Sequence, residues 1–144
     1  MNHNDENQLH FNPQIKHHNN LRNVTFNNKN SIKIWYFNAR SIINKNDELE
    51  LILKEITKTK HQIHIIAITE HWMNDINIKT YNFMNYNTIF STRKIRKGGG
   101  SALFINNQLK YKLIENYNDE QNHITSVEIN TSAEKFIITC IYRQ

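Results

Sequence analysis

The chain has 144 residues and a formal net charge of +5, and 38% of its residues are hydrophobic. Three Gly, one Pro and one Cys exclude collagen-like, Pro/Gly-rich and disulfide-scaffold proteins. No apolar stretch approaches the roughly 18 residues that a membrane span requires, and residues 1–30 lack the apolar core of a signal peptide. We therefore expect an intracellular protein with no membrane partner and no disulfide partner for Cys140, which lies in an apolar run and reads as a buried small hydrophobe.

Asparagine is unusually frequent, and it divides the chain in two. Of 24 Asn residues, ten fall within the first 30 positions. A tract this polar buries too little apolar surface to offset the entropy of ordering it. The sequence predicts a disordered Asn-rich segment over residues 1–30 and one folded domain over residues 31–144.

The folded part begins with a strand–helix–strand pattern. Residues 32–37 are β-branched and aromatic, which is typical of a strand, and residues 63–69 form a second short, isoleucine-rich strand. Between them, Leu49, Ile52, Leu53 and Ile56 recur at helical spacing, with Asn46 as the expected N-cap. This order predicts two parallel strands joined by a helix.

The rest of the chain has strand-like patterns and no second clear helix. The expected strands cover residues 86–91, 101–106, 109–115, 123–130 and 135–142, and the last two form a plausible hairpin. The predicted fold class is α/β, a layered domain that is mostly sheet.

Four basic residues crowd into one loop: Arg93, Lys94, Arg96 and Lys97. Such a cluster favours a polyanionic partner such as nucleic acid, although a solvated basic loop has the same composition. Gly98-Gly99-Gly100 follows, and these glycines indicate either a flexible turn or a close approach of another backbone.

Polar residues stand at the ends of three predicted strands. Asn38 ends the first and Glu70 ends the second, so a parallel pairing would bring them to one rim, where an amide and a carboxylate can bind Mg²⁺. Tyr142 and Arg143 end the last strand and could both donate to a phosphate oxygen. Ordinary turn and packing roles remain open for all four residues.

Four segments together resemble consecutive motifs of the endonuclease/exonuclease/phosphatase family, and most closely the apurinic/apyrimidinic-endonuclease-like domain of non-LTR (LINE-type) retrotransposons. The resemblance covers about residues 32–144. The segments are Phe37-Asn38-Ala39-Arg40-Ser41, Ile68-Thr69-Glu70-His71-Trp72-Met73, Arg93 to Gly100 followed by Ser101-Ala102-Leu103-Phe104-Ile105, and Ile141-Tyr142-Arg143.

The resemblance implies a Mg²⁺-dependent (or Mn²⁺-dependent) endonuclease that hydrolyses phosphodiesters, with DNA as the expected nucleic acid and the nucleus as its location if that DNA is genomic. It implies catalytic roles for Asn38, Glu70 and Tyr142. Glu70 and Asn38 match the metal-site residues and Tyr142 matches a phosphate-binding Tyr. The basic loop beginning at Arg93, together with Arg143, would contact nucleic acid. His71 stands where the family usually has Thr, and we assign it no catalytic role.

The family's later catalytic motifs lie beyond its Tyr motif, whereas this sequence stops at Gln144. The resemblance therefore implies the first part of a four-layer α/β sandwich that binds its metal weakly and is catalytically incomplete as this chain. We expect the inner face of its sheet to be uncovered, and residues 136–141, apolar on both faces, to form a central buried strand.

Two further hypotheses stay open at this point. The chain could be a non-catalytic nucleic-acid-binding module or a degenerate remnant of such a nuclease domain. It could also be a small α/β phosphate-binding domain unrelated to the family.

Overall fold

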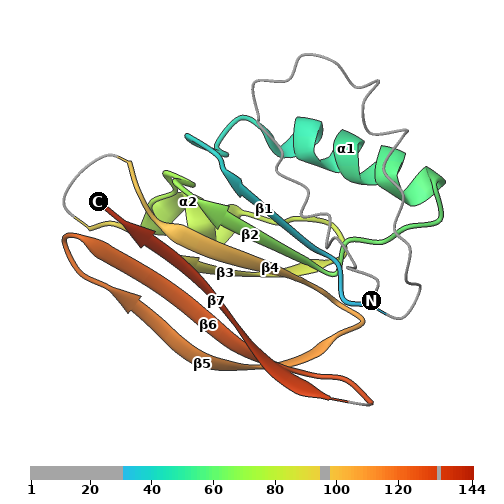
Figure 1. The fold of residues 1–144 in the computed structure, drawn as a ribbon. Helices are drawn as coiled ribbons and strands as arrows, with labels where there is room; N and C mark the ends of the chain where they lie inside the picture. The colour runs from blue at the N-terminus through green and yellow to red at the C-terminus, as the bar shows by residue number, and fades with distance from the viewer. Residues whose placement is uncertain (1–30, 95–97, 133) are drawn as a thin grey trace, which may run out of the picture.

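A computed structural model describes residues 31–94, 98–132 and 134–144. The disorder expected for residues 1–30 lies outside the described residues. The described chain forms three layers, in which a helix covers one face of a four-stranded sheet and a three-stranded sheet covers the other (Figure 1). The mixed α/β class with mostly strands is confirmed.

The four-stranded sheet contains the predicted strand–helix–strand unit. Its strands are β1 (Ile34–Asn38), β2 (Ile65–Thr69), β3 (Tyr86–Ser91) and β4 (Ser101–Asn106), in the order β1-β2-β4-β3. Helix α1 (Asn46–Lys58) connects β1 to β2, which pair in parallel, and the other two pairings are antiparallel. The helix starts one residue after Lys45, so Asn46 is its first residue and not the N-cap that we predicted.

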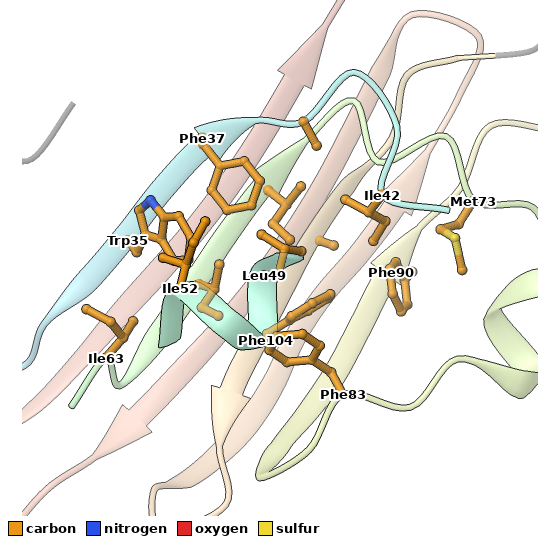
Figure 2. Close-up of a cluster of buried hydrophobic side chains, with 14 residues drawn as sticks. Trp35, Phe37, Ile42, Leu49, Ile52, Ile63, Met73, Phe83, Phe90 and Phe104 are labelled. Atoms are coloured by element: carbon orange, nitrogen blue, oxygen red, sulfur yellow. The ribbon is translucent and has the colours of Figure 1, made fainter. Parts of the chain in front are cut away.

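The first hydrophobic core lies between α1 and this sheet (Figure 2). Leu49 and Ile52 of the helix are buried there, as their spacing predicts. They pack in one cluster with Trp35 and Phe37 of β1, whose ring centroids are 4.8 Å apart. Strand β1 alternates buried and exposed residues, whereas β2 is buried along its whole length because it is covered on both faces.

The second core lies between the two sheets. Strands β5 (Lys110–Asn118), β6 (Asn122–Asn130) and β7 (Lys135–Arg143) form an antiparallel meander, which confirms the predicted hairpin. Val127 and Ile129 of β6 pack against β2 and β4. Cys140 of β7 is buried beside them, and burial raises the pKa of its thiol to about 11, as suits a packing residue.

Two predictions about the sheets are wrong. The inner face of the four-stranded sheet is covered, because β5, β6 and β7 turn back over it. Strand β7 is not central: in the order β5-β6-β7 it is an edge strand among the described residues, and Ile137 and Ile141 are exposed at 64% and 58%. The apolar face left open is therefore the outer face of the three-stranded sheet.

A second helix that the sequence patterns did not reveal, α2 (Asp75–Thr80), follows β2. The side chain of Asn74 caps it by accepting hydrogen bonds from the backbone N–H groups of Ile76 and Asn77, at 3.0 and 2.8 Å. In the described part of the chain, no helix is both long enough and apolar enough to cross a membrane.

Candidate functional site

The ends of β1 and β2 meet at one rim of the four-stranded sheet. Asn38 lies opposite Thr69 in the parallel register, so Glu70 follows immediately beyond the pair. The backbone N–H of Ser41 donates to the carbonyl of Glu70 at 2.8 Å, which holds the two strand exits together. The structure thus confirms that Asn38 and Glu70 share a rim. The Oδ1 atom of Asn38 accepts a hydrogen bond from the Arg40 N–H at 3.3 Å.

The Glu70 carboxylate is held by an aromatic neighbour. Trp72 Nε1 donates to Glu70 Oε2 at 3.1 Å. The Glu70 side chain is half-buried, so it is partly open to solvent.

Tyr142, on β7 of the other sheet, lies close enough to the Glu70 carboxylate for its charge to act on the phenol. The pKa of Tyr142 is raised, first by desolvation and then by the nearby negative Glu70 carboxylate, while Arg93 opposes the shift. The phenol therefore remains protonated at neutral pH and can donate a hydrogen bond. Residues that sequence reasoning placed on different strands, Glu70 and Tyr142, are in this way brought together.

The backbone of the glycine triplet packs closely against this site. Of the two interpretations of the triplet, the close approach therefore holds, and not the flexible turn. A Cβ on Gly99 would lie 3.0 Å from Tyr142 Cε1 and 3.6 Å from Arg93 Cδ. A Cβ on Gly100 would lie 2.2 Å from Nε2 of His71. A side chain at Gly100 would clash with the buried His71, and one at Gly99 would displace Tyr142, so the glycines allow the loop to pack against both sheets.

Left-handed backbone is concentrated at the rim. Four residues other than Gly have positive φ there, at 45°, 87°, 56° and 60°, and Gly98, Gly99 and Gly100 add three more. The four are Arg40, Ser41, Glu70 and Trp72. For a residue other than glycine, each such conformation costs about 1–3 kcal/mol and persists only where its surroundings enforce it, a pattern concentrated at functional sites.

His71 is a structural residue beneath the site. Its Nδ1 accepts from the Met73 N–H at 2.9 Å, so the other nitrogen, Nε2, carries the proton and donates to the Ser91 carbonyl at 3.0 Å. Complete burial lowers the pKa of His71 to about 4. The neutral imidazole therefore ties the segment after β2 to the end of β3.

The residues predicted to contact nucleic acid differ in their exposure and in their distance from Tyr142. Arg93 is half-buried next to Tyr142, and its guanidinium donates to the Glu120 carbonyl at 3.4 Å and to the Gln144 side chain. Lys94 is exposed, whereas Arg96 and Lys97 lie outside the described residues. Arg143 is also exposed, but because neighbouring strand residues point to opposite faces, it is separated from Tyr142.

Two further residues of the site were not predicted from the sequence, Trp72 and His123. His123 is 1% exposed and lies across from Tyr142 on β6, with ring centroids 5.8 Å apart. A pocket of about 440 Å³ opens beside Arg93 against the turn between β5 and β6. The Trp two positions after Glu70 was a visible signal, whereas nothing in the sequence linked His123 to Tyr142.

The residues at the rim fit a weakly bound divalent cation. Among the described residues, no three His, Cys, Asp or Glu side chains group together, so a cage made of protein ligands alone is not formed there. Mg²⁺ characteristically uses one or two carboxylates and takes its remaining ligands from water and phosphate. The partly open Glu70 carboxylate and the exposed Asn38 amide can fill that smaller role.

No protein-family model and no curated protein matches the chain. Among solved structures, the chain is similar to the endonuclease domain of TRAS1, a telomere-specific non-LTR retrotransposon, with a TM-score of 0.53 and 16% sequence identity. The match covers 78% of this chain and 46% of that one, so the chain spans less than half of that structure. The described layers therefore share the fold of part of a retrotransposon endonuclease domain, while membership of the endonuclease/exonuclease/phosphatase family stays a prediction.

Proposed function

We propose that this domain is part of a Mg²⁺-dependent endonuclease of the endonuclease/exonuclease/phosphatase type that hydrolyses phosphodiesters in nucleic acid, with DNA as its substrate. The observation that supports this most directly is the glycine triplet, whose Gly100 carbonyl accepts from the Glu70 N–H while Gly99 packs against Tyr142 and Arg93, so that these residues lie at one rim. The likeness to a retrotransposon endonuclease domain supports the same class of reaction. Genomic DNA as the substrate would place the protein in the nucleus.

Each residue has a distinct role in this proposal. Glu70 and Asn38 hold the cation, and Tyr142 donates its phenolic proton in a hydrogen bond to a nonbridging oxygen of the scissile phosphate. Arg93, close to Tyr142 and partly open to solvent, adds positive charge beside the phosphate. The cation would polarise the phosphoryl oxygen and stabilise the charge of the leaving group.

The described residues supply only part of a hydrolytic site. In the described ranges, Glu70 belongs to no group of three or more His, Cys, Asp or Glu side chains that could hold a metal ion. General acid–base groups each contribute about 10² to 10⁴ in rate. We accordingly propose that this chain binds cation and phosphate while hydrolysing phosphodiesters slowly.

Cation binding tests the proposal. Calorimetry with MnCl₂ should show weak binding to the full chain and at least a tenfold loss in Glu70→Gln, because the neutral amide removes the ligand charge. Glu134→Gln, an exposed glutamate in the turn between β6 and β7, is the matched control and should bind as the wild type does. Equal binding by all three proteins would remove Glu70 from a metal site.

A non-catalytic nucleic-acid-binding module is the second candidate, and it is favoured because the described residues contain no group of three or more His, Cys, Asp or Glu side chains that could hold a metal ion. The two are separated by adding Mg²⁺ during titration with a duplex oligonucleotide. A nuclease-type site should bind phosphate more tightly with Mg²⁺ in a manner that requires Glu70. A plain binding module should show the same affinity in wild type and Glu70→Gln.

A further inference from the structure

We propose that Trp72 is the positioning residue that fixes the Glu70 carboxylate for cation binding, and that the glycine triplet 98–100 holds Trp72 in place for this role. The inference rests on the proposed function, because it assigns the residue that orients the proposed metal ligand. It concerns Trp72 itself, to which neither the fold nor the resemblance assigns a role.

The contact between the two side chains is direct. Trp72 Nε1 donates to Glu70 Oε2 at 3.1 Å. An indole has one donor and no acceptor, so this bond commits its single polar group to one oxygen of the carboxylate. Trp72 leaves the other oxygen uncommitted, so a cation can bind it in place of the neighbouring Tyr142 phenol, and the bond opposes rotation of the carboxylate about its last bond. Outer partners of this kind orient metal ligands in proteins.

The geometry depends on an unusual backbone. Glu70 and Trp72 have φ of 56° and 60°, and the buried His71 stands between them. In regular extended backbone, residues two apart point in the same direction but are spread along the strand, at about 3.3 Å per residue. The two left-handed residues instead bend the segment, and the indole of Trp72 reaches back to the carboxylate of Glu70.

Each glycine of the triplet contacts this bent segment. The Gly100 carbonyl accepts from the Glu70 N–H at 2.9 Å, and the Gly99 carbonyl accepts from the Trp72 N–H at 3.2 Å. A Cβ on Gly98 would lie 3.5 Å from Trp72 Nε1, so the backbone of Gly98 lies against the indole next to its donor atom. The two backbone bonds fix the ends of the segment, and the packing contact fixes the ring.

The second tryptophan offers an internal control. Trp35 lies on β1 in the core between α1 and the four-stranded sheet (Figure 2). Its partner on β2 is Ile66, four residues before Glu70. The chain has two Trp residues, so a ¹H–¹⁵N spectrum of the protein contains two indole N–H signals, one from each environment.

The experiment is an NMR titration of the full chain with MgCl₂, followed by MnCl₂ affinity measurements on variants. The Trp72 indole signal should shift and saturate with Mg²⁺, the Trp35 signal should stay in place, and Glu70→Gln should abolish the Trp72 shift. Trp72→Phe keeps an aromatic ring against Gly98 but lacks the N–H, and we expect its affinity for Mn²⁺ to fall about 10- to 100-fold. Trp35→Phe should retain the wild-type affinity.

The outcomes distinguish this inference from the proposed function. Cation binding that requires Glu70, with an unmoved Trp72 signal and an unchanged affinity in Trp72→Phe, would overturn the positioning role and leave the proposed function intact. Absence of any Glu70-dependent binding would overturn both. The titration of the wild-type protein decides the question even if Trp72→Phe does not fold.

Discussion

Among the three glycines, Gly100 is the one at which an added Cβ meets the closest neighbour. Its φ is +94°, and an added Cβ would lie 2.2 Å from Nε2 of the fully buried His71. Backbone strain and overpacking together should lower the free energy of unfolding of Gly100→Ala by about 2–4 kcal/mol, measured by urea denaturation.

Gly98→Ala is the matched control for that substitution. Its φ of +100° is equally unfavourable for alanine, but its Cβ would meet Trp72 at an ordinary 3.5 Å. We expect a loss of only about 1–2 kcal/mol there, from backbone strain alone. Equal losses in the two variants would show that the contact with His71 does not matter.

His71 should make the protein sensitive to acid. Its pKa is about 4 in the folded state, against 6.5 for an ordinary histidine. Between pH 4 and pH 6.5, His71 binds a proton in the unfolded chain but not in the folded chain. The contribution of His71 to the free energy of unfolding is therefore complete above pH 6.5 and is lost as the pH falls towards 4. The shift corresponds to about 3 kcal/mol from this residue.

The measurement for His71 is an NMR titration of its imidazole signals. In the folded protein the titration midpoint should lie near pH 4, and in urea-unfolded protein near 6.5. A folded-state midpoint close to 6.5 would contradict the buried, neutral imidazole that donates to the Ser91 carbonyl.

At the scale of elements, the loop after β3 should govern binding to nucleic acid. Each Lys or Arg contact to a phosphate of duplex DNA contributes about 0.9 to the slope of log affinity against log salt. Replacing Arg93 and Lys94 with Ser should therefore reduce that slope by as much as about 2, measured by fluorescence anisotropy with a labelled duplex. Replacing Arg96 and Lys97 as well should flatten it further.

Two lysines of β5 provide the control for charge alone. Lys110→Ser with Lys112→Ser removes the same number of charges from the other end of the three-stranded sheet, since Lys110 pairs with Asn130 and Asn118 with His123. We expect the wild-type salt slope from that variant. A reduced slope there, with no change from the loop variant, would relocate the contacts to β5.

The elements with strong periodicity could be predicted from the sequence, and the shorter ones could not. The spacing of Leu49 and Ile52 specifies α1 because one buried face repeats at 3.6 residues. Helix α2 has six residues and no buried face, so only its Asn74 cap signalled it. Strand β7 was misplaced because residues apolar on both faces resemble a central strand even when the sheet ends there.

The candidate site divides in the same way. The common rim of Asn38 and Glu70 follows from a parallel strand pair, which topology alone determines. The hydrogen bond from Trp72 to Glu70 depends on two left-handed residues, and the contact of Tyr142 with Gly99 depends on how two sheets pack. Neither leaves a periodic signal in the sequence.

For the whole molecule, the outer face of the three-stranded sheet is an exposed apolar surface. Ile141 lies opposite Ile124, which lies opposite Tyr117, so an apolar row crosses all three strands, and Ile137 stands further along β7. We expect the full chain to bind a hydrophobic dye. The double variant Ile137→Thr, Ile141→Thr should bind less dye while its free energy of unfolding changes by less than about 1 kcal/mol, because both side chains are already exposed.

Ile76→Thr is the control for the dye experiment, since Ile76 is 78% exposed on α2, away from this sheet. It should leave dye binding unchanged. If the double variant on β7 bound as much dye as the wild type, the dye-binding apolar surface would have to lie elsewhere.

The candidate site takes its parts from both sheets, since Asn38 and Glu70 follow strands of one and Tyr142 belongs to the other. The alignment of the Tyr142 phenol with the Glu70 carboxylate consequently depends on how the two sheets pack against each other. Val127 and Ile129 belong to the core that fixes this packing. A smaller side chain in that interlayer core could let the sheets shift by a fraction of an ångström, and misalignment of about 1 Å can cost a hundredfold in rate. Substitutions that weaken cation or phosphate binding need not map to the rim, and a folded protein with weakened binding is the expected result of mild damage to the core between the sheets.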